Sequence, residues 1–217
     1  MNRSSHLPSR SRGFNLLEVL VALVVTMIGL LGIAGLQARA HTAELESYQR
    51  AQALVLLYDM VNRINNNQLT APCFAVTTNT ANGTPYLGTV AGGGHFSTPT
   101  TSCGVSTILN NALANNSINA WDDVLRGASE KKGAGAAEVG GMIGARGCIS
   151  YNTASEFVDA GTGANIAGTG EYTISVSWQG IGDTFAPTVS CGKDLYGSET
   201  KRRTVWVTIR LGTLAAR

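Results

Sequence analysis

Charged residues are scarce in this sequence, and the basic ones do not form an extended cluster. Only 14% of the 217 residues are charged, and the formal net charge is +2. Arg3, Arg10 and Arg12 fall within residues 1–13, which contain no acid, so the rest of the chain has a net charge of +2 − 3 = −1. A nucleic-acid surface requires clustered Lys and Arg. The short run at residues 201–203 is expected in a solvated turn, and no nucleic-acid partner is expected.

Residues suited to a catalytic or metal site are also sparse. His6, His41 and His95 lie in separate segments, so they suggest neither a metal-ligand set nor a catalytic triad. The adjacent Asp122 and Asp123 are expected to cap or solvate a helix rather than to perform acid–base chemistry. The glycine-rich runs lack the flanking residues of a phosphate-binding loop. The sequence therefore predicts a protein that is not an enzyme and has no metal or cofactor.

One long apolar segment contrasts with this polar, glycine-rich remainder. Residues 19–36 are eighteen consecutive positions without a charge. Counted from Phe14, the segment forms a helix of about 35 Å, which is enough to cross a hydrocarbon core of about 30 Å. The arginines that precede it favour a cytoplasmic N-terminus by the positive-inside rule. Everything after Leu36 is therefore expected to be exported.

The helix is expected to continue beyond the membrane, because residues 37–67 contain neither proline nor glycine. Its apolar residues recur at the spacing of one helical face: Tyr48, Ala51, Leu54, Leu57, Tyr58, Val61 and Ile64. The polar tract from Asn65, followed by Pro72, predicts the end of the helix near residue 67. The first half of the helix is apolar on all sides and the second half is amphipathic. The first is therefore expected to lie in the membrane and the second to pack against a globular domain.

Strand signals gather late in the chain. They lie in CISYN from Cys148, EYTISVSWQ from Glu171 and TVWVTIRL from Thr204. In the second of these, Ile174, Val176 and Trp178 alternate with serines, which predicts a strand buried on one face only.

These elements predict an α+β fold, a long N-terminal helix whose amphipathic half packs on an antiparallel β-sheet. Two short helices are expected at residues 108–114 and 120–125, and residues 127–147 are expected to form a loop. The expected organisation is a leader (1–13), a transmembrane and assembly segment (14–36), an amphipathic helix half (37–67) and a periplasmic β-rich head (68–217).

Four cysteines lie in the exported part, and none forms a CxxC pair, which argues against a zinc site. An even count in an oxidising compartment favours two disulfides over four reduced, buried cysteines. Three connectivities are possible. We expect Cys73–Cys103 with Cys148–Cys191, since each bridge then closes a local loop.

The motif that carries the functional interpretation is Gly-Phe-x-Leu-Leu-Glu at Gly13–Glu18, between the basic leader and the apolar run. It resembles the prepilin signal of type IV pilins and type II secretion pseudopilins. The resemblance implies cleavage after Gly13 by a membrane aspartyl prepilin peptidase, and N-methylation of Phe14. A plain signal anchor is the alternative, but a charged residue within a membrane span costs about 2.5 to 3.5 kcal/mol.

Glu18 is expected to act in assembly. Cleavage creates a cationic amine on Phe14, one helical turn from Glu18, and the amine of the same or a neighbouring subunit can neutralise the carboxylate. An unpaired carboxylate among bundled apolar helices would be costly. Many major pilins have a proline in this helix, whereas this chain has Gly29, Gly32 and Gly35, which either weaken the helix locally or permit close packing.

A weaker resemblance narrows the family. Residues 50–68, the AWDDVL stretch at 120–125 and the YTISVSW strand are similar to the minor pilins called PilV, the type IV pilus modification proteins. This implies a structural subunit that starts in the inner membrane with its head in the periplasm and then enters the pilus. The implied partners are the prepilin peptidase, other minor pilins, the major pilin and the inner-membrane assembly platform.

Other functions remain open at this point. A minor pseudopilin of a type II secretion system would share the leader and its chemistry. A membrane-anchored adhesin or binding module that never polymerises would keep its leader and tolerate changes at Glu18. An anchored periplasmic enzyme lacks a catalytic residue set.

Overall fold

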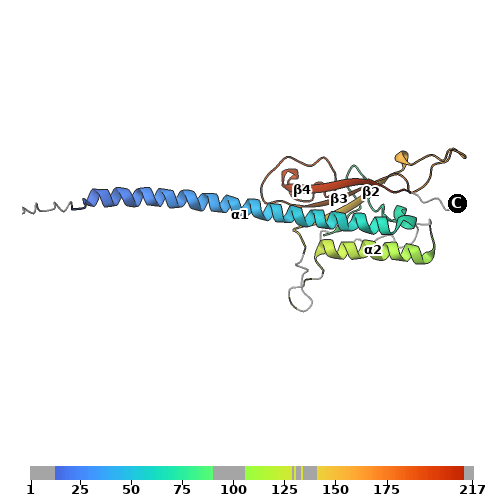
Figure 1. Cartoon of the computed structure of the whole chain (residues 1–217), viewed down its shortest axis with the longest axis horizontal. Coiled ribbons are helices and arrows are strands. Elements are labelled where there is room, and N and C mark those ends of the chain that lie inside the picture. Colours follow the sequence, from blue (N-terminus) through green and yellow to red (C-terminus); the bar gives the residue numbers. More distant parts are fainter. Residues whose placement is uncertain (1–12, 90–105, 129, 131–132, 134–140, 213–217) are drawn as a thin grey trace, which may run out of the picture. The chain divides into compact units, whose positions relative to one another are not determined.

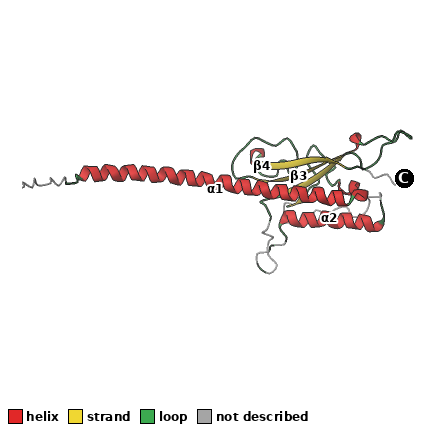
Figure 2. Ribbon diagram, in the orientation of Figure 1, coloured by secondary structure: helices red, strands yellow, loops and turns green. Residues whose placement is uncertain are grey.

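The computed structural model describes residues 13–89, 106–128, 130, 133 and 141–212 (Figure 1). The chain divides into two compact units, Met1–Leu45 and Glu46–Arg217, and each is considered by itself. In order, the regular elements are helix α1, 3₁₀ turn η1, strand β1, helix α2, strand β2, turn η2, strand β3, turn η3 and strand β4 (Figure 2). A long apolar N-terminal helix followed by an antiparallel four-stranded sheet is the α+β, type IV pilin-like fold that the sequence predicts.

Helix α1 runs from Leu16 to Asn66 without interruption, close to the expected range of 14–67. It contains no proline, and its three glycines do not break it. Pro72 lies just beyond, in η1 (Gln68–Phe74), where the chain no longer follows α-helical hydrogen bonding. In the first unit every described residue is exposed.

The face of α1 that packs in the second unit differs from the expected one. The buried residues are Ala53, Leu57, Met60 and Ile64. Of the expected face, only Leu57 and Ile64 are buried, whereas the side chains of Tyr48 and Tyr58 are 62% and 57% exposed. Residues 53–61 are apolar on several sides of the helix, so their spacing does not fix which side turns inward.

The sheet lies entirely in the second unit and is antiparallel throughout. Its order is β1 (Leu87–Gly88), β2 (Arg146–Asn152), β3 (Glu171–Gln179) and β4 (Arg202–Arg210). The pairing of β3 with β4 is continuous from Glu171 opposite Arg210 to Gln179 opposite Arg202. The three long strands fall where the alternating residues predict them, and the two-residue β1 was not expected.

Helix α2 (Ile108–Arg126) is one helix, where two short ones were expected. The Thr107 hydroxyl caps its first turn by accepting a hydrogen bond from the Asn110 N–H, and Gly127 ends it in the left-handed conformation. Its buried apolar residues repeat at helical spacing through the asparagine-rich middle: Ala114, Ile118, Trp121 and Leu125. Tertiary packing along this face therefore outweighs the low helix propensity of the asparagines.

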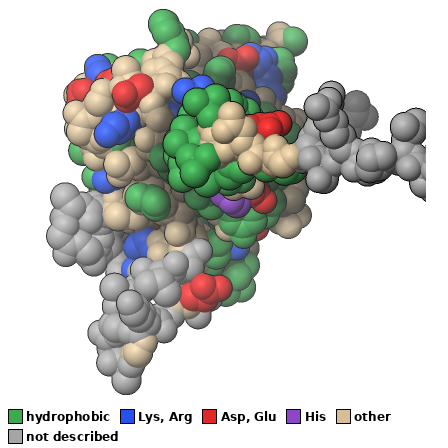
Figure 3. All heavy atoms as spheres, turned by 90° about the vertical axis from the view of Figure 1, so that its left-hand side faces the viewer, with side chains coloured by type: hydrophobic (Ala, Val, Ile, Leu, Met, Phe, Trp, Pro, Cys, Tyr) green, Lys and Arg blue, Asp and Glu red, His purple; other side chains and the backbone are tan. Residues whose placement is uncertain are grey.

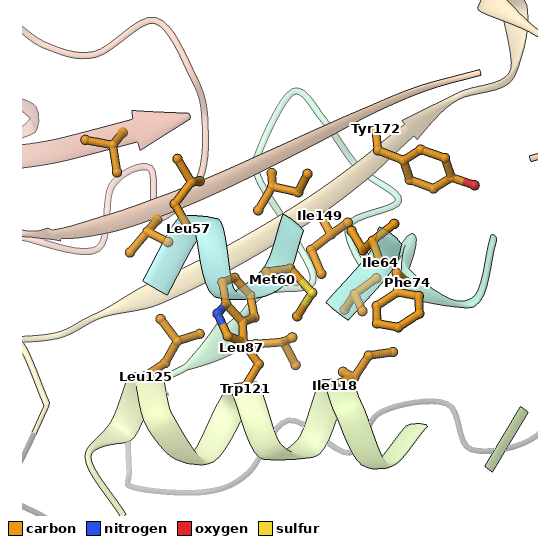
Figure 4. Packing of buried hydrophobic residues seen from close by; sticks show 14 of the residues in the cluster. Leu57, Met60, Ile64, Phe74, Leu87, Ile118, Trp121, Leu125, Ile149 and Tyr172 are labelled. Carbon is orange, nitrogen blue, oxygen red and sulfur yellow. The ribbon is translucent and has the colours of Figure 1, made fainter. Parts of the chain in front are cut away.

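The hydrophobic core lies where α1, α2 and the sheet meet. In Figure 4, Met60 of α1 lies between Ile149 on the sheet side and Trp121 of α2, and the Leu57 side chain points from α1 toward the sheet. The Trp121 indole N–H donates to the Leu56 carbonyl at 2.9 Å, so its polar atom is satisfied. Its ring lies against Gly147 of β2, where a Cβ would come within 2.3 Å of two ring carbons.

The outer face of the sheet is covered as well, which the alternating pattern of β3 did not predict. Ser175 and Ser177 are 2% and 0% exposed. The Ser177 hydroxyl donates to the Cys191 carbonyl at 2.8 Å, in the loop between β3 and β4. This loop packs over the serines, so β3 is buried on both faces.

Arg202 corrects the expectation of a solvated basic turn at residues 201–203. It is 2% exposed, forms an ion pair with Glu199 at 2.5 Å and donates to the carbonyls of Pro187, Val189 and Cys191. A buried guanidinium must have its donors satisfied. Arg202 therefore holds the β3–β4 loop in place by collecting its carbonyl groups.

Candidate functional site

The predicted processing and assembly residues lie at the start of the first unit. Gly13 and Phe14 precede the helix, and the Phe14 side chain is 83% exposed. Glu18 lies in the first turn of α1, and its N–H donates to the Asn15 carbonyl at 2.9 Å. A carboxylate in the first turn is favoured by the positive end of the helix dipole. Residues 1–12, which hold the rest of the expected leader, lie outside the described residues.

The apolar surface around Glu18 has no partner within the first unit. The side chains of Leu20, Ile28 and Leu31 are 58%, 66% and 73% exposed, and the other large apolar residues of the segment are similar. Figure 3, in which the N-terminal end of α1 faces the viewer, shows hydrophobic side chains gathered around this end of the helix. Each large apolar side chain left in water forgoes about 1.5 to 3 kcal/mol of burial. The segment is therefore built to lie in lipid or against apolar helices.

The hydroxyl of Thr26, within this segment, is satisfied locally. The Thr26 hydroxyl donates to the carbonyls of Ala22 and Leu23, both at 2.9 Å. Such back-bonding lets a hydroxyl enter an apolar environment without an external partner. By length and composition, the helix is long and apolar enough to cross a membrane.

Gly29, Gly32 and Gly35 leave the surface of this helix open. In the described structure, a Cβ built on any of them meets no atom within 4 Å. No contact within the described chain therefore requires small residues at these positions. Close approach by another helix, one of the two explanations considered from the sequence, would use this open surface.

Glu46 marks the first residue of the second unit. Its Oε1 accepts hydrogen bonds from the N–H groups of Ile181 and Gly182 at 3.1 and 3.0 Å, and from Arg203 Nη2 at 3.1 Å. The backbone hydrogen bond from Gly182, followed by the charge and hydrogen bond of Arg203, lowers the pKa of Glu46 below its usual 4.5, against the opposing effect of burial. These contacts join α1 to the β3–β4 loop and the start of β4.

Asp122 is a structural residue whose role the sequence analysis missed. It is 2% exposed, accepts a hydrogen bond from the Gly88 N–H at 2.6 Å and pairs with Arg126 at 3.1 Å. It therefore fastens α2 to the outer edge of β1. The spacing of Asp122 and Arg126, four residues apart on a helix, was the available signal.

The cysteines confirm one expected bridge. Cys148 of β2 and Cys191 of the β3–β4 loop form a disulfide, and both are buried. Cys73 in η1 is also disulfide-bonded. Cys103 lies outside the described residues, so its pairing with Cys73 remains a prediction.

The described residues contain no group of three or more His, Cys, Asp or Glu that could hold a metal ion. His41 lies on the exposed surface of α1, with Glu44 as its neighbour, while His6 and His95 lie outside the described residues.

Comparison with known proteins supports the prepilin interpretation of the N-terminal segment. Residues 8–34 match the family described as the prokaryotic N-terminal methylation motif. The matched range includes Gly13, Phe14 and Glu18. No curated protein and no solved structure matches the chain. The motif supports a type IV pilin-like subunit, of pilin or pseudopilin type, and implies processing by a prepilin peptidase and association with membrane-bound pilus machinery.

Proposed function

We propose that this protein is a minor pilin, similar to the PilV group, that takes part in type IV pilus assembly. It is made as an inner-membrane precursor with a periplasmic head, cut between Gly13 and Phe14, and methylated on the Phe14 amine. The observation that carries the proposal is the N-terminal stretch of α1, which is exposed on every side, has one carboxylate in its first turn and lies largely within the matched methylation motif. Its partners are other minor pilins, the major pilin and the assembly platform.

The proposed chemistry of Glu18 follows from its place. After cleavage, the Phe14 amine lies four residues away, roughly 6 Å along a helix axis. In a bundle of apolar helices, a carboxylate and an amine that remain unpaired both carry a large desolvation cost. Pairing between subunits removes that cost only at one axial offset, so the same pair that neutralises the charges also sets the register of neighbours.

The proposal is tested first by the mature N-terminus. Intact mass and N-terminal sequencing should show 217 − 13 = 204 residues beginning with N-methylphenylalanine. Gly13→Leu should leave uncut precursor in the membrane. Gly29→Leu is the matched control, because neither glycine has an atom within 4 Å of a built Cβ in the described structure. A mature protein that still starts at Met1 would contradict the proposal.

A minor pseudopilin of a type II secretion system is the second candidate, because the matched motif supports both kinds of subunit. Deletion of the gene separates them. The minor-pilin proposal predicts fewer surface pili with secreted enzymes unchanged, while the pseudopilin alternative predicts the reverse.

A further inference from the structure

The two edges of the sheet are protected very differently. At one edge, β1 is only two residues long, and its Gly88 N–H donates to the Asp122 carboxylate of α2. At the other edge, β4 is nine residues long and contains no proline. Its register with β3 is continuous, so no bulge interrupts it. Short strands, bulges, prolines and covering elements are the usual ways of closing an edge to other chains.

The hydrogen bonding shows which groups of β4 point outward. Gly180 N–H donates to the Lys201 carbonyl, so this opposed pair is a hydrogen-bonded one. Bonded and non-bonded pairs alternate along an antiparallel ladder. Thr204, Trp206 and Thr208 therefore direct their N–H and C=O groups away from β3. Within the described part of the chain, these backbone groups have no hydrogen-bond partner.

The side chains along β4 are suited to contact with a strand added at this edge. Trp206 lies at the middle of β4, and its side chain is 53% exposed. It is flanked on the same face by Thr204 and Thr208, whose hydroxyls are 2.8 Å and 3.3 Å from those of Ser177 and Thr173 in β3. An exposed indole between satisfied hydroxyls offers apolar area without an unpaired charge.

A second copy of this chain does not fit the edge. Every pair in this sheet is antiparallel. Antiparallel pairing of β4 with β4 of another copy requires a two-fold axis perpendicular to the sheet, which reverses every direction in the sheet plane. The packed part of α1, residues 46–66, lies along that plane, because its buried residues pack against the sheet in one core. The two helices would therefore point in opposite directions. Anchors in one membrane require the same direction. A copy in the same orientation would instead offer its β1, which is short and held by Asp122.

We propose that β4 accepts an edge strand from a different pilin-like subunit, which continues the sheet. In a subunit of the same orientation and topology, the first strand runs antiparallel to β4 and would continue the antiparallel sheet. The partner must therefore have a longer, open first edge, with an apolar side chain placed beside Trp206. Main-chain hydrogen bonds would supply the affinity, and the contact with Trp206 would supply the specificity. This inference rests on the proposed function, because it assumes that neighbouring subunits share one membrane.

The test is photo-crosslinking from position 206 of the full-length protein, in cells that produce type IV pili. p-Benzoylphenylalanine should form an adduct that peptide mass spectrometry maps to an edge strand of another chain with an N-terminal methylation motif. Thr208→Pro removes an outward N–H without removing a bond to β3 and should lower the adduct yield at least ~10-fold. Thr208→Val, which keeps the N–H, should leave the yield unchanged.

Absence of an adduct, an adduct with a second copy, or a yield insensitive to Thr208→Pro would each overturn the proposal. Thermal unfolding checks that the proline variant folds. If it does not, hydrogen exchange on the wild-type complex decides the question, since the outward amides of β4 should exchange about 100-fold more slowly than in the purified chain. An adduct formed by a chain that keeps its leader would contradict the proposed function and leave strand addition standing.

Discussion

The two stretches of helix α1 contain similar apolar residues, which are exposed in one stretch and partly buried in the other. In residues 16–45 all side chains are exposed, whereas in residues 46–66 Ala53, Leu57, Met60 and Ile64 are almost completely buried. One stretch is stabilised by contacts with its own head, whereas the apolar side chains of the other are covered by no described residue of the chain. A single helix thus belongs to a folded domain at one end and presents an uncovered apolar surface at the other. Substitutions in the two stretches should therefore change different measurements.

The largest expected effect is that of Glu18→Ala on assembly. Leaving a Phe14 amine unpaired among apolar helices costs about 3 to 5 kcal/mol, which corresponds to a loss of assembled protein on the order of 100-fold or more. Insertion, cleavage and the melting temperature of the head should be unchanged. Quantitative immunoblots of sheared pili measure the assembled protein, and immunoblots of membranes measure insertion and cleavage. Thermal unfolding measures the melting temperature of the head.

Glu44→Ala is the matched control, because Glu44 lies in the same stretch with a side chain that is 79% exposed. It should assemble normally. Normal levels of the Glu18→Ala protein in pili would show that Glu18 has no role in pairing.

The next largest effect is expected from removing the Cys148–Cys191 disulfide. Replacing both cysteines by alanine should lower the free energy of unfolding of the head by about 3 to 4 kcal/mol, because the bridge closes a loop between residues 43 apart. Denaturant unfolding of the double variant, compared with the unaltered protein, measures this change in the free energy of unfolding. Processing at Gly13 should not change, and an unchanged unfolding midpoint would contradict the prediction.

A pair of leucine substitutions sharpens the comparison directly. Leu57→Ala should destabilise the head by about 2 to 5 kcal/mol, because Leu57 is 2% exposed within the core. Leu30→Ala, at a position 66% exposed, should leave the unfolding midpoint of the head unchanged. Equal effects of the two substitutions would mean that the two stretches are not energetically separate.

The smallest effect concerns pH. The pKa of Glu46 is lowered in the folded protein, so its contribution to stability is present above its usual 4.5 and is lost as pH falls through the lower folded value. Glu46→Gln should lower the melting temperature by a few degrees near neutral pH, and the two curves should converge as the pH falls below 4.5. Curves that stay parallel over this range would contradict the assignment.

The parts of the fold that the sequence predicted well are those with a strong local signal. Strand β3 was expected at its observed bounds because three apolar residues alternate with serines, and the uninterrupted α1 followed from the absence of proline. The N-terminal motif pointed to Gly13, Phe14 and Glu18 because these three residues lie within six positions of one another, so the motif can be recognised without knowledge of the fold. The structure places Phe14 and Glu18 on an exposed surface, while the cleavage itself remains a proposal.

What the sequence did not predict depends on contacts between distant segments. Arg202 is buried because the carbonyls of the β3–β4 loop gather around it, and Asp122 because an N–H of β1 meets it. The inward face of α1 was misjudged since apolar residues lie on several sides of the helix. Ser175 and Ser177 look solvent-facing in the pattern, yet a loop joined to β2 by a disulfide covers them.

The close approach of Gly147 to Trp121 restricts how this head can vary during evolution. A methyl group at position 147 would fall within the van der Waals radius of the indole ring, and Leu125 closes the remaining space at 2.7 Å. A side chain can appear at position 147 only after residue 121 becomes smaller, and a smaller residue 121 leaves a cavity that a larger residue 147 would fill. In related heads these two positions should therefore change together, so that their covariation would reveal the packing of α2 on β2 from sequences alone.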